Sequence, residues 1–298
     1  MNLSQSRALL AVADFGNFSE AALELQLSQP AISHAIATLE AELGVPLFSR
    51  GRHGAVLTPA GERIVYHARQ VLQHLDLMQQ EANLQRGLQG GRVRVASFRS
   101  VATHLLPKVI AQFRDRHPDV IITIIERPDY LDIEQCLREG RADIGITYLP
   151  TSSEFEAWEL LRDDYLVLLP PATKVKGAQI TWQELAEFPL VQLPCLPCGR
   201  ILHNYLKKLA LPMNTASDIQ EDSTIVSMVV QNLGAAILPR LAAEPIPNTV
   251  IVHHLPSPLQ RVIGAAVLSS TLHIPAVFAF LEMLRKLDLE SLAKIPSA

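Results

Sequence analysis

The sequence predicts an α/β protein built from two unlike parts, and three features of its pattern carry this prediction. Short amphipathic helices joined by tight turns occupy the first part, up to residue 43. A single long helix is expected from about residue 59. After a glycine-rich break at residues 87–91, strand-like segments alternate with helices, which indicates a mainly parallel sheet. The 298 residues suffice for about two domains.

The first part of the chain is expected to form three helices. The first spans residues 4–14 and has Ser4 as its predicted cap, and the second spans residues 19–25. In the third helix, Ser28 suits the capping position and Pro30 lies in the first turn, where a missing N–H group costs nothing. One apolar stripe along this helix is formed by Ile32, Ile36, Leu39 and Leu43.

A hairpin and a long helix are expected to follow. The glycine-rich, basic segment at residues 45–56 is short enough to form a hairpin like a wing beside the three helices. The long helix has Thr58 as its predicted cap and Pro59 at its first position. Apolar residues then repeat every seven positions in two interleaved series, Ile64, Val71 and Met78, and Ala68, Leu75 and Ala82. Such a seam predicts a pair of dimerising helices, and the alternative is an amphipathic helix that packs on its own domain.

The second part of the chain is expected to form two lobes. The predicted strands are residues 92–96, 120–126 and 142–148, with two more within 155–169. The predicted helices are residues 105–116, 131–139, 182–185, 199–209, 223–232 and 275–287. Crossing connections are expected near residues 150–162 and 262–268. They would divide this part into lobe I, about residues 91–161 and 266–298, and lobe II, about residues 162–265.

Composition limits the class of protein. Hydrophobic residues make up 48% of the chain and charged residues 19%, which is typical of a folded protein. No apolar run reaches the roughly 18 residues of a membrane span, and the first residues lack the basic and apolar blocks of a secretory signal. We therefore expect a cytoplasmic protein with no membrane partner. The three cysteines do not form a disulfide framework and are expected to be reduced thiols.

Signatures of catalysis are absent from the sequence. It contains no GxSxG motif, no GxGxxG after a strand, no P-loop and no HExxH. We therefore expect no enzyme, no cofactor and no metal. One alternative is an oxidoreductase that uses the CxxC motif of Cys195 and Cys198, which leaves the helical first part unexplained. A solute-binding protein could share the two lobes, but it would need an export signal and would not need the N-terminal helices.

The first part suits a helix-turn-helix that reads DNA. In that motif the N-terminal residues of the second helix contact base edges in the major groove. Gln29, Ser33 and His34 would point away from the apolar stripe, and a glutamine can pair bidentately with adenine. The alternative is a solvated helix face. The net charge is −4, and the first 90 residues hold eight acidic against six basic residues, so only Arg50 and Arg52 could form a local basic patch.

Several contiguous segments resemble the LysR-type transcriptional regulators. In the first part these are FSEAA (18–22), LSQPAIS (27–33), LE (39–40), LGVPLFSR (43–50) and LTPAG (57–61). In the second part they are LLP (105–107), Phe113, HP (117–118), GRADIGI (140–146) and GAAILP (234–239). The resemblance implies a winged helix-turn-helix domain at residues 1–58, a linker and dimerisation helix at 59–90, and an effector-sensing domain with two periplasmic-binding-protein-like lobes at 91–298.

The resemblance also implies homodimers or homotetramers on double-stranded operator DNA. The residues expected to contact the DNA are Ser28, Gln29, Pro30, Ser33, His34, Arg50 and Arg52. Many relatives carry arginine at the position of His34. A neutral histidine would make a weaker and pH-sensitive contact, so the base pairs that are read stay open.

A small-molecule effector between the lobes is a further implication of the resemblance, and it would change the geometry of DNA binding. The expected effector contacts are Ser97, Phe98, Arg99, Ser100, Thr147, Tyr148, Gln192, Cys195 and Cys198. A guanidinium, hydroxyl groups and helix N-termini suit a carboxylate or a phosphate. Two alternatives stay open: Arg99 could form a surface salt bridge, and Ser97 and Ser100 could cap the helix that starts there.

The CxxC motif of Cys195 and Cys198 is open to three interpretations. The two residues could line the effector pocket, act as a redox pair, or provide a reactive thiol or half of a metal site. Some LysR-type regulators sense peroxide with cysteines in this part of the fold. No second CxxC or flanking His–Cys cluster completes a zinc site in the sequence. Cys136 is expected in the core.

Overall fold

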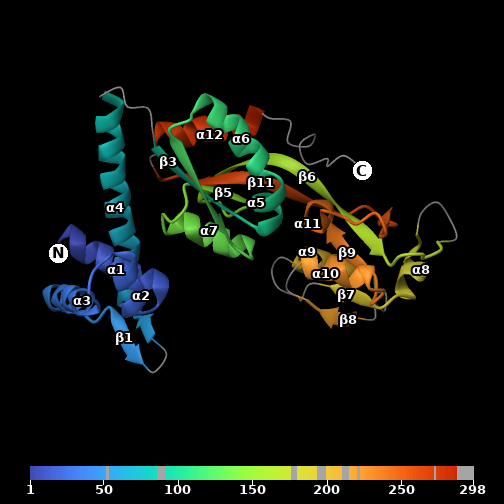
Figure 1. Cartoon of the computed structure of the whole chain (residues 1–298), viewed down its shortest axis with the longest axis horizontal. Helices are drawn as coiled ribbons and strands as arrows, with labels where there is room; N and C mark the ends of the chain where they lie inside the picture. The colour runs from blue at the N-terminus through green and yellow to red at the C-terminus, as the bar shows by residue number, and fades with distance from the viewer. Residues whose placement is uncertain are drawn as a thin grey trace. The chain divides into compact units, whose positions relative to one another are not determined.

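The computed structural model describes residues 1–51, 54–85, 91–175, 180–192, 199–209, 215–219, 222–271 and 273–286. The chain divides into two compact units, each described by itself: Met1–Leu88 with Glu139–Arg141, and Gln89–Arg138 with Ala142–Ala298. Figure 1 labels the elements of both. Within the described ranges, no helix combines the length and apolar character needed to pass through a membrane.

The described residues of the first unit form four helices and a hairpin. Its elements are α1 (Leu3–Phe15), α2 (Phe18–Glu24), α3 (Gln29–Leu43), β1 (Phe48–Gly51), β2 (Gly54–Leu57) and α4 (Pro59–Gln85). β1 and β2 pair antiparallel, with Phe48 opposite Leu57. The unit therefore has the predicted winged helix-turn-helix arrangement, in which α2 and α3 are the helix pair and the hairpin is the wing.

Polar side chains set where the helices of this unit begin. Ser28 and Thr58 each accept a hydrogen bond from an N–H group in the first turn of the helix that follows, so both predicted caps are confirmed. The prediction of Ser4 as the cap of α1 is wrong. Asn2 caps α1, because its side chain accepts from the Gln5 N–H while the Gln5 side chain accepts from the Asn2 N–H, a reciprocal capping box.

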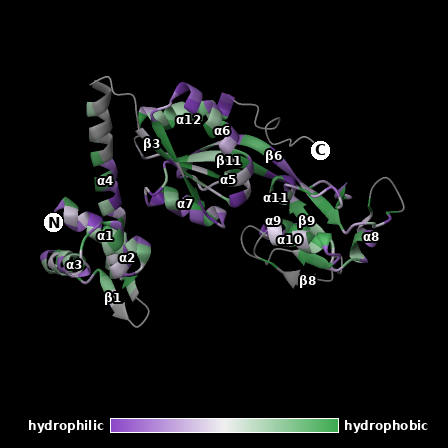
Figure 2. Ribbon diagram, viewed as in Figure 1, coloured by the Kyte–Doolittle hydropathy of each residue, from purple (hydrophilic) through white to green (hydrophobic). Residues whose placement is uncertain are grey.

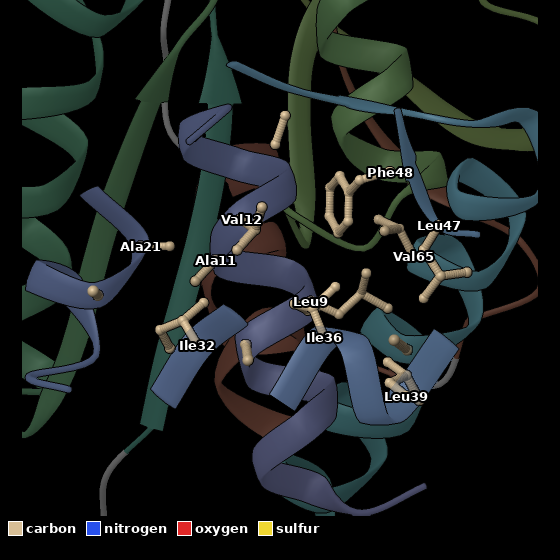
Figure 3. Close-up of a cluster of buried hydrophobic side chains, with 14 residues drawn as sticks. Leu9, Ala11, Val12, Ala21, Ile32, Ile36, Leu39, Leu47, Phe48 and Val65 are labelled. Atoms are coloured by element: carbon tan, nitrogen blue, oxygen red, sulfur yellow. The ribbon is translucent and has the colours of Figure 1, made fainter. Parts of the chain in front are cut away.

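One hydrophobic core holds the first unit together (Figure 3). Its buried side chains include Leu9, Val12, Ala21, Ile32, Ile36, Leu39, Leu47, Phe48, Val65 and Ala68. Each large aliphatic side chain buried in this way contributes about 1.5–3 kcal/mol. The predicted stripe on α3 is confirmed except at Leu43, which is 38% exposed because it lies in the last turn of the helix. Val65 and Ala68 show that the start of α4 belongs to this core.

In the second unit, lobe I is a sheet with helices on both faces. Its elements are β3 (Gly91–Ser97), α5 (Arg99–His104), α6 (Leu106–Arg116), β4 (Val120–Glu126), α7 (Tyr130–Arg138), β5 (Ile144–Tyr148), the first part of β6 (Phe155–Leu169), β11 (Gln260–Leu268) and α12 (Pro275–Lys286). The strand order is β6–β11–β5–β3–β4, and β3 runs parallel to both β4 and β5. α6 and α12 lie over one face and α7 over the other (Figure 1). Hydrophobic residues concentrate in the strands between them (Figure 2).

Lobe II is built around the second part of β6. Its other elements are α8 (Trp182–Ala186), β7 (Leu190–Gln192), α9 (Arg200–Lys208), β8 (Thr215–Asp218), α10 (Asp222–Val230), β9 (Ala236–Pro239), α11 (Arg240–Ala243) and β10 (Ile251–His254). β9 and β10 both pair antiparallel with β6, and β7 pairs parallel with β8. β6 and β11 are thus the two strands that cross between the lobes.

Two predictions about the sheet are wrong. The sheet is mixed instead of mainly parallel, because β9, β10 and β11 all run antiparallel to their neighbours. Residues 155–169 form one continuous strand instead of two. β6 changes partners without ending: it pairs with β11 as far as Asp164 and with β9 and β10 from Tyr165 onward.

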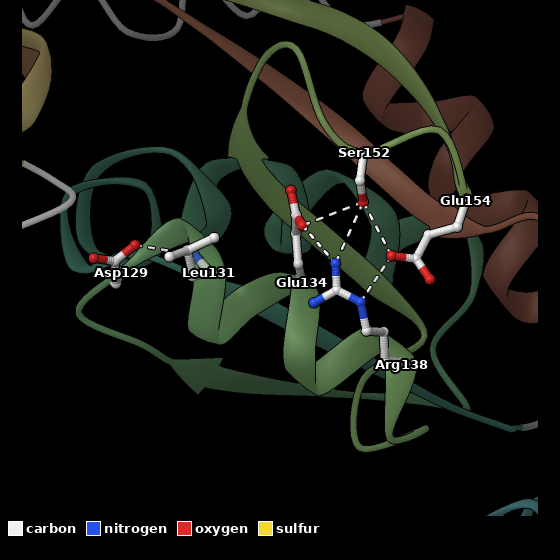
Figure 4. Close-up of polar contacts among 6 residues, drawn as sticks. All are labelled: Asp129, Leu131, Glu134, Arg138, Ser152 and Glu154. Carbon is white, nitrogen blue, oxygen red and sulfur yellow. Dashed lines mark hydrogen bonds and ion pairs between the residues drawn. The ribbon is translucent and has the colours of Figure 1, made fainter.

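A polar network fixes the connection that leads into β6 (Figure 4). Arg138 on α7 donates to Glu134 Oε2 and to Glu154 Oε1, both at 2.8 Å. Ser152 Oγ donates to Glu154 Oε1 at 3.0 Å. The Arg138 guanidinium also lies 5.2 Å from the centre of the Phe155 ring. Charge-assisted hydrogen bonds of this kind anchor the start of the crossing strand to lobe I.

Candidate functional site

The exposed face at the start of α3 carries residues that are expected to read DNA. Gln29 and His34 are exposed and Ser33 is half-buried, on the side of the helix away from its buried stripe. The Gln29 Nε2 donates to Ser33 Oγ at 3.1 Å. Ser28 and Pro30 are exposed in the same turn. The structure thus gathers these five residues at one helix end, where amide and hydroxyl groups can donate to and accept from base edges.

The predicted basic patch of the wing falls largely outside the described residues. Arg50 lies on β1, opposite Ala55 on β2. The side chain of Arg50 and the whole of Arg52 lie outside the description.

Glu40, which belongs to the LE motif but not to the predicted site residues, positions the wing relative to α3. Its Oε1 accepts hydrogen bonds from the backbone N–H groups of Leu47 and Phe48 at 2.7 and 3.1 Å. The hairpin is also tied to the end of α1, because the Ala55 N–H donates to the Gly16 carbonyl at 2.8 Å. The available signal was an acidic residue that directly follows Leu39 of the apolar stripe, near the end of the helix.

Two buried hydroxyl groups lie at the carboxyl ends of β3 and β5 in lobe I. Ser97 is the last residue of β3, and Thr147 lies one residue before the end of β5, the parallel strand beside it. After β3 the chain forms β4 on one side of it and then β5 on the other side, so the direction of strand addition reverses at β3. Open α/β sheets bind ligands at such switch points. Both side chains are 0% exposed, and among the described residues neither hydroxyl oxygen has a hydrogen-bond partner. A buried polar group left unpaired costs about 1–3 kcal/mol, so both hydroxyls are suited to a polar ligand.

Arg261, which was not among the predicted site residues, lies beside this point. It lies on β11, and its Nε and Nη2 contact Asp163 Oδ2 on β6 at 2.8 and 2.7 Å. Its Nη1 donates to the Tyr148 hydroxyl at 2.9 Å and its Nη2 donates to Ser100 Oγ at 3.0 Å. Burial acts to lower the pKa of Arg261, but attraction by Tyr148 and Asp163 outweighs it, so the pKa is raised and the group stays charged. A single arginine inside the apolar strand QRVIGAAVL was the signal.

Aromatic rings surround the buried guanidinium. The centre of the Phe98 ring lies 4.9 Å from the Arg261 guanidinium carbon. Phe98 also packs on Tyr148, with ring centres 4.8 Å apart. Phe98 also occupies the capping position of α5, without a side-chain cap. The alternative in which Ser97 or Ser100 caps this helix is therefore wrong.

Two polar contacts connect the lobes near these residues. Arg99 Nη2 lies 3.3 Å from Asp222 Oδ2 at the start of α10, so the salt-bridge alternative for Arg99 is present in this structure. Arg200 on α9 donates to the hydroxyl of Tyr130 on α7, and its guanidinium lies 5.8 Å from the centre of that ring. An anion placed here would compete with Asp222 for a guanidinium.

The remaining predicted effector contacts are only partly described. The side chain of Gln192 and both cysteines of the CxxC motif, Cys195 and Cys198, lie outside the described residues. Cys136 is fully buried, as expected for a core residue, and its sulfur accepts a hydrogen bond from Arg127 Nε at 3.3 Å.

The two units define a class of protein: a winged helix-turn-helix followed by a two-lobed α/β domain suited to bind a small ligand. Two family models match the chain. The model described as "Bacterial regulatory helix-turn-helix protein, lysR family" matches residues 3–62, and the one described as "LysR substrate binding domain" matches residues 86–288. The chain therefore belongs to the LysR family of transcriptional regulators, as the sequence motifs indicated.

A close relative supports this assignment over nearly the whole chain. The "Probable HTH-type transcriptional regulator LrrA" of Synechococcus elongatus is 52% identical over 286 residues, which cover 96% of this chain and 97% of the relative.

Solved structures share the fold along the full length. A cysteine variant of full-length OxyR from Pseudomonas aeruginosa has a TM-score of 0.72 at 25% identity and covers 97% of this chain and 99% of its own. CbnR, a LysR family transcriptional regulator, has a TM-score of 0.71 at 20% identity, with coverage of 99% and 100%. CbnR complexed with its target DNA has a TM-score of 0.57 at 21% identity, with the same coverage. At these identities the likeness to CbnR establishes the fold alone.

Proposed function

We propose that this regulator reads operator DNA with the start of α3 and the wing, dimerises through α4, and responds to a small organic anion bound between the lobes. The observation that carries the effector part is the pair of buried, unpartnered hydroxyls of Ser97 and Thr147. Both hydroxyls lie at the carboxyl ends of β3 and β5, at the switch point of the lobe I sheet.

DNA reading is supported by the exposed end of α3. Gln29, Ser33 and His34 present side-chain donors and acceptors beside a helix N-terminus, which itself attracts phosphate. Arg50 and Arg52 would contribute phosphate contacts from the wing. Because the first 90 residues carry a net negative charge, these local contacts must supply the attraction to DNA.

Dimerisation is supported by the later part of α4. Val71 and Met78 are 41% and 69% exposed, and Ala82 is exposed as well. Ala68 is buried in the core of its own unit and Ile64 packs against that core. The proposed dimer seam therefore begins at Val71, later than the heptad pattern suggests, because the start of α4 already has a partner.

An anionic effector is supported by two cationic side chains that make contacts between the lobes. Arg99 and Arg200 come from opposite lobes, and an anion could replace Asp222 as the partner of Arg99. Binding between lobes shifts their closure only by the difference in affinity for the two states. A coupling of about 1–3 kcal/mol is enough to reposition bound dimers without releasing them from a many-contact DNA complex.

Two measurements on the full-length protein test this proposal. A mobility-shift assay at fixed salt should show preferential binding to the DNA upstream of its own gene. Thermal-shift screening of mono- and dicarboxylates and phosphate esters should then give a stabilising ligand. Its effect should disappear in Ser97→Ala/Thr147→Val while DNA binding persists. Binding without preference for that DNA contradicts the regulatory assignment, and a ligand effect that survives the double substitution places the effector elsewhere.

A thiol-based redox sensor is the second candidate, favoured by the likeness to OxyR. It would use Cys195 and Cys198 in place of an anion site. The decisive comparison is between Arg99→Ala and Cys195→Ser/Cys198→Ser. If the cysteine variant alone loses the response to the inducing signal, the anion proposal is wrong and the thiol sensor replaces it.

A further inference from the structure

Arg261 and Asp163 form an ion pair at the point where the two crossing strands meet. Arg261 on β11 lies directly opposite Asp163 on β6 in the strand register. The two residues are 4% and 5% exposed, so the pair is largely shielded from water and from salt. Separating the two members of such a pair leaves an uncompensated buried charge. Neither side chain is therefore expected to change its position without the other.

The two ends of this ion pair contact opposite lobes. On the lobe I side, the guanidinium donates to the Ser100 hydroxyl on α5 at 3.0 Å and to the Tyr148 hydroxyl on β5 at 2.9 Å. On the lobe II side, Asp163 Oδ1 accepts from the backbone N–H of Leu241 on α11 at 3.1 Å. A continuous path of hydrogen bonds therefore runs from the two hydroxyls of lobe I to the start of α11.

We propose that Arg261 is a positioning residue that couples the effector site of lobe I to α11 in lobe II. This inference rests on the proposed effector site, because Ser100 on α5 and Tyr148 on β5 are among the residues expected to contact the ligand. The guanidinium is planar and its donors form a rigid fork, so a changed partner on one side reorients the whole group. A ligand that engages Ser100 or Tyr148 then alters how Asp163 holds α11.

The chain offers a matched pair of double variants to test this coupling. Ser100→Ala/Tyr148→Phe removes both lobe I acceptors and keeps the buried ion pair, so the protein should still fold. Ser97→Ala/Thr147→Val is the control, because it removes two buried hydroxyls at neighbouring positions, neither of which has a described hydrogen-bond partner. In the described part of the chain, Arg261 donates hydrogen bonds to both residues of the first pair and to neither residue of the control pair.

The readout is amide hydrogen exchange at Leu241 in the full-length protein without ligand. In Ser100→Ala/Tyr148→Phe the Arg261 guanidinium loses two hydrogen-bond partners. The Leu241 amide should then exchange roughly three- to tenfold faster, the range expected for one net hydrogen bond. The control variant should leave this rate as in the unaltered protein. The Val109 amide of α6 reports general loosening and should keep its rate in both variants.

Two results would overturn the coupling: equal rates at Leu241 in both double variants, or a parallel rise at Val109, which indicates general destabilisation. Arg261→Lys tests whether the effect passes through the guanidinium. It keeps the charge opposite Asp163 but not the fork, so Ser100→Ala/Tyr148→Phe should have no further effect in that background. None of these measurements needs ligand or DNA. A mobility-shift assay that shows no preferential binding would therefore refute the regulatory assignment and leave the exchange result standing. An unchanged exchange rate at Leu241 would refute the coupling and leave the regulatory assignment standing.

Discussion

A Cβ atom placed on Gly61 would lie 2.1 Å from the carbonyl oxygen of Leu47. That oxygen already accepts a hydrogen bond from the Thr58 N–H at 2.9 Å, so it cannot move away without breaking the junction between wing and linker helix. The first turn of α4 and the start of the wing are therefore in direct backbone contact. Position 61 requires glycine because of this close approach, and not because of its backbone angles.

Gly61→Ala is expected to destabilise the first unit by about 1–3 kcal/mol or more, because the methyl group overpacks against backbone. Urea unfolding of the full-length protein measures the effect. Gly44→Ala is the matched control. Gly44 has φ +70° with nothing within 4 Å of an added Cβ, so only the cost of a left-handed backbone, about 1–2 kcal/mol, applies there. A smaller effect at Gly61 than at Gly44 would contradict this interpretation.

Gln29→Ala should reduce discrimination between operator and unrelated DNA by about 1–3 kcal/mol while the fold is retained, because a bidentate base contact is lost. Competition mobility shifts at constant salt measure the ratio of the two affinities. Thr38→Ala, farther along the same helix, serves as the control and should keep that ratio. Unchanged discrimination in Gln29→Ala would show that Gln29 does not contribute to the recognition of base pairs.

Met78→Asp should shift the protein toward smaller species in sedimentation without lowering the stability of the first unit. Met78 is 69% exposed within one chain, so its substitution harms only a contact between chains. Ala68→Asp provides the contrast. Its side chain is buried in the core, and a charge there should unfold the unit itself. If Met78→Asp leaves the oligomer intact, the seam lies elsewhere.

Two partly buried histidines should make the second unit less stable in acid. Burial lowers the pKa of His104 and His273 from 6.5, and Glu244 and Asp143 respectively oppose the shift only in part. The unfolded chain then binds more protons, so stability is fully present above about pH 6.5 and is lost as the pH falls through the folded-state values.

His104→Gln/His273→Gln should therefore flatten the fall in the free energy of unfolding between about pH 7 and about pH 5. Urea titrations at several pH values measure this slope. The same slope in the variant and in the unaltered protein would show that other groups cause the acid sensitivity.

Local sequence patterns determined the helices of the first unit. Ser28 and Thr58 had to cap helices because their hydroxyls precede helical runs, and Ile32, Ile36 and Leu39 had to face inward because of their spacing. The contiguous motifs around them identified the family as well. These features depend on residues close together in the chain, so they can be predicted without the fold.

Tertiary structure decided what depends on distant residues. The heptad pattern on α4 does not say that Ala68 faces its own core while Met78 is left exposed. Likewise, the antiparallel return of β11 is what brings Arg261 against Asp163, Ser100 and Tyr148, residues far from it in sequence. A charge in an apolar strand can be noticed in the sequence, but its partners follow only from strand pairing, because register and burial are properties of the assembled sheet.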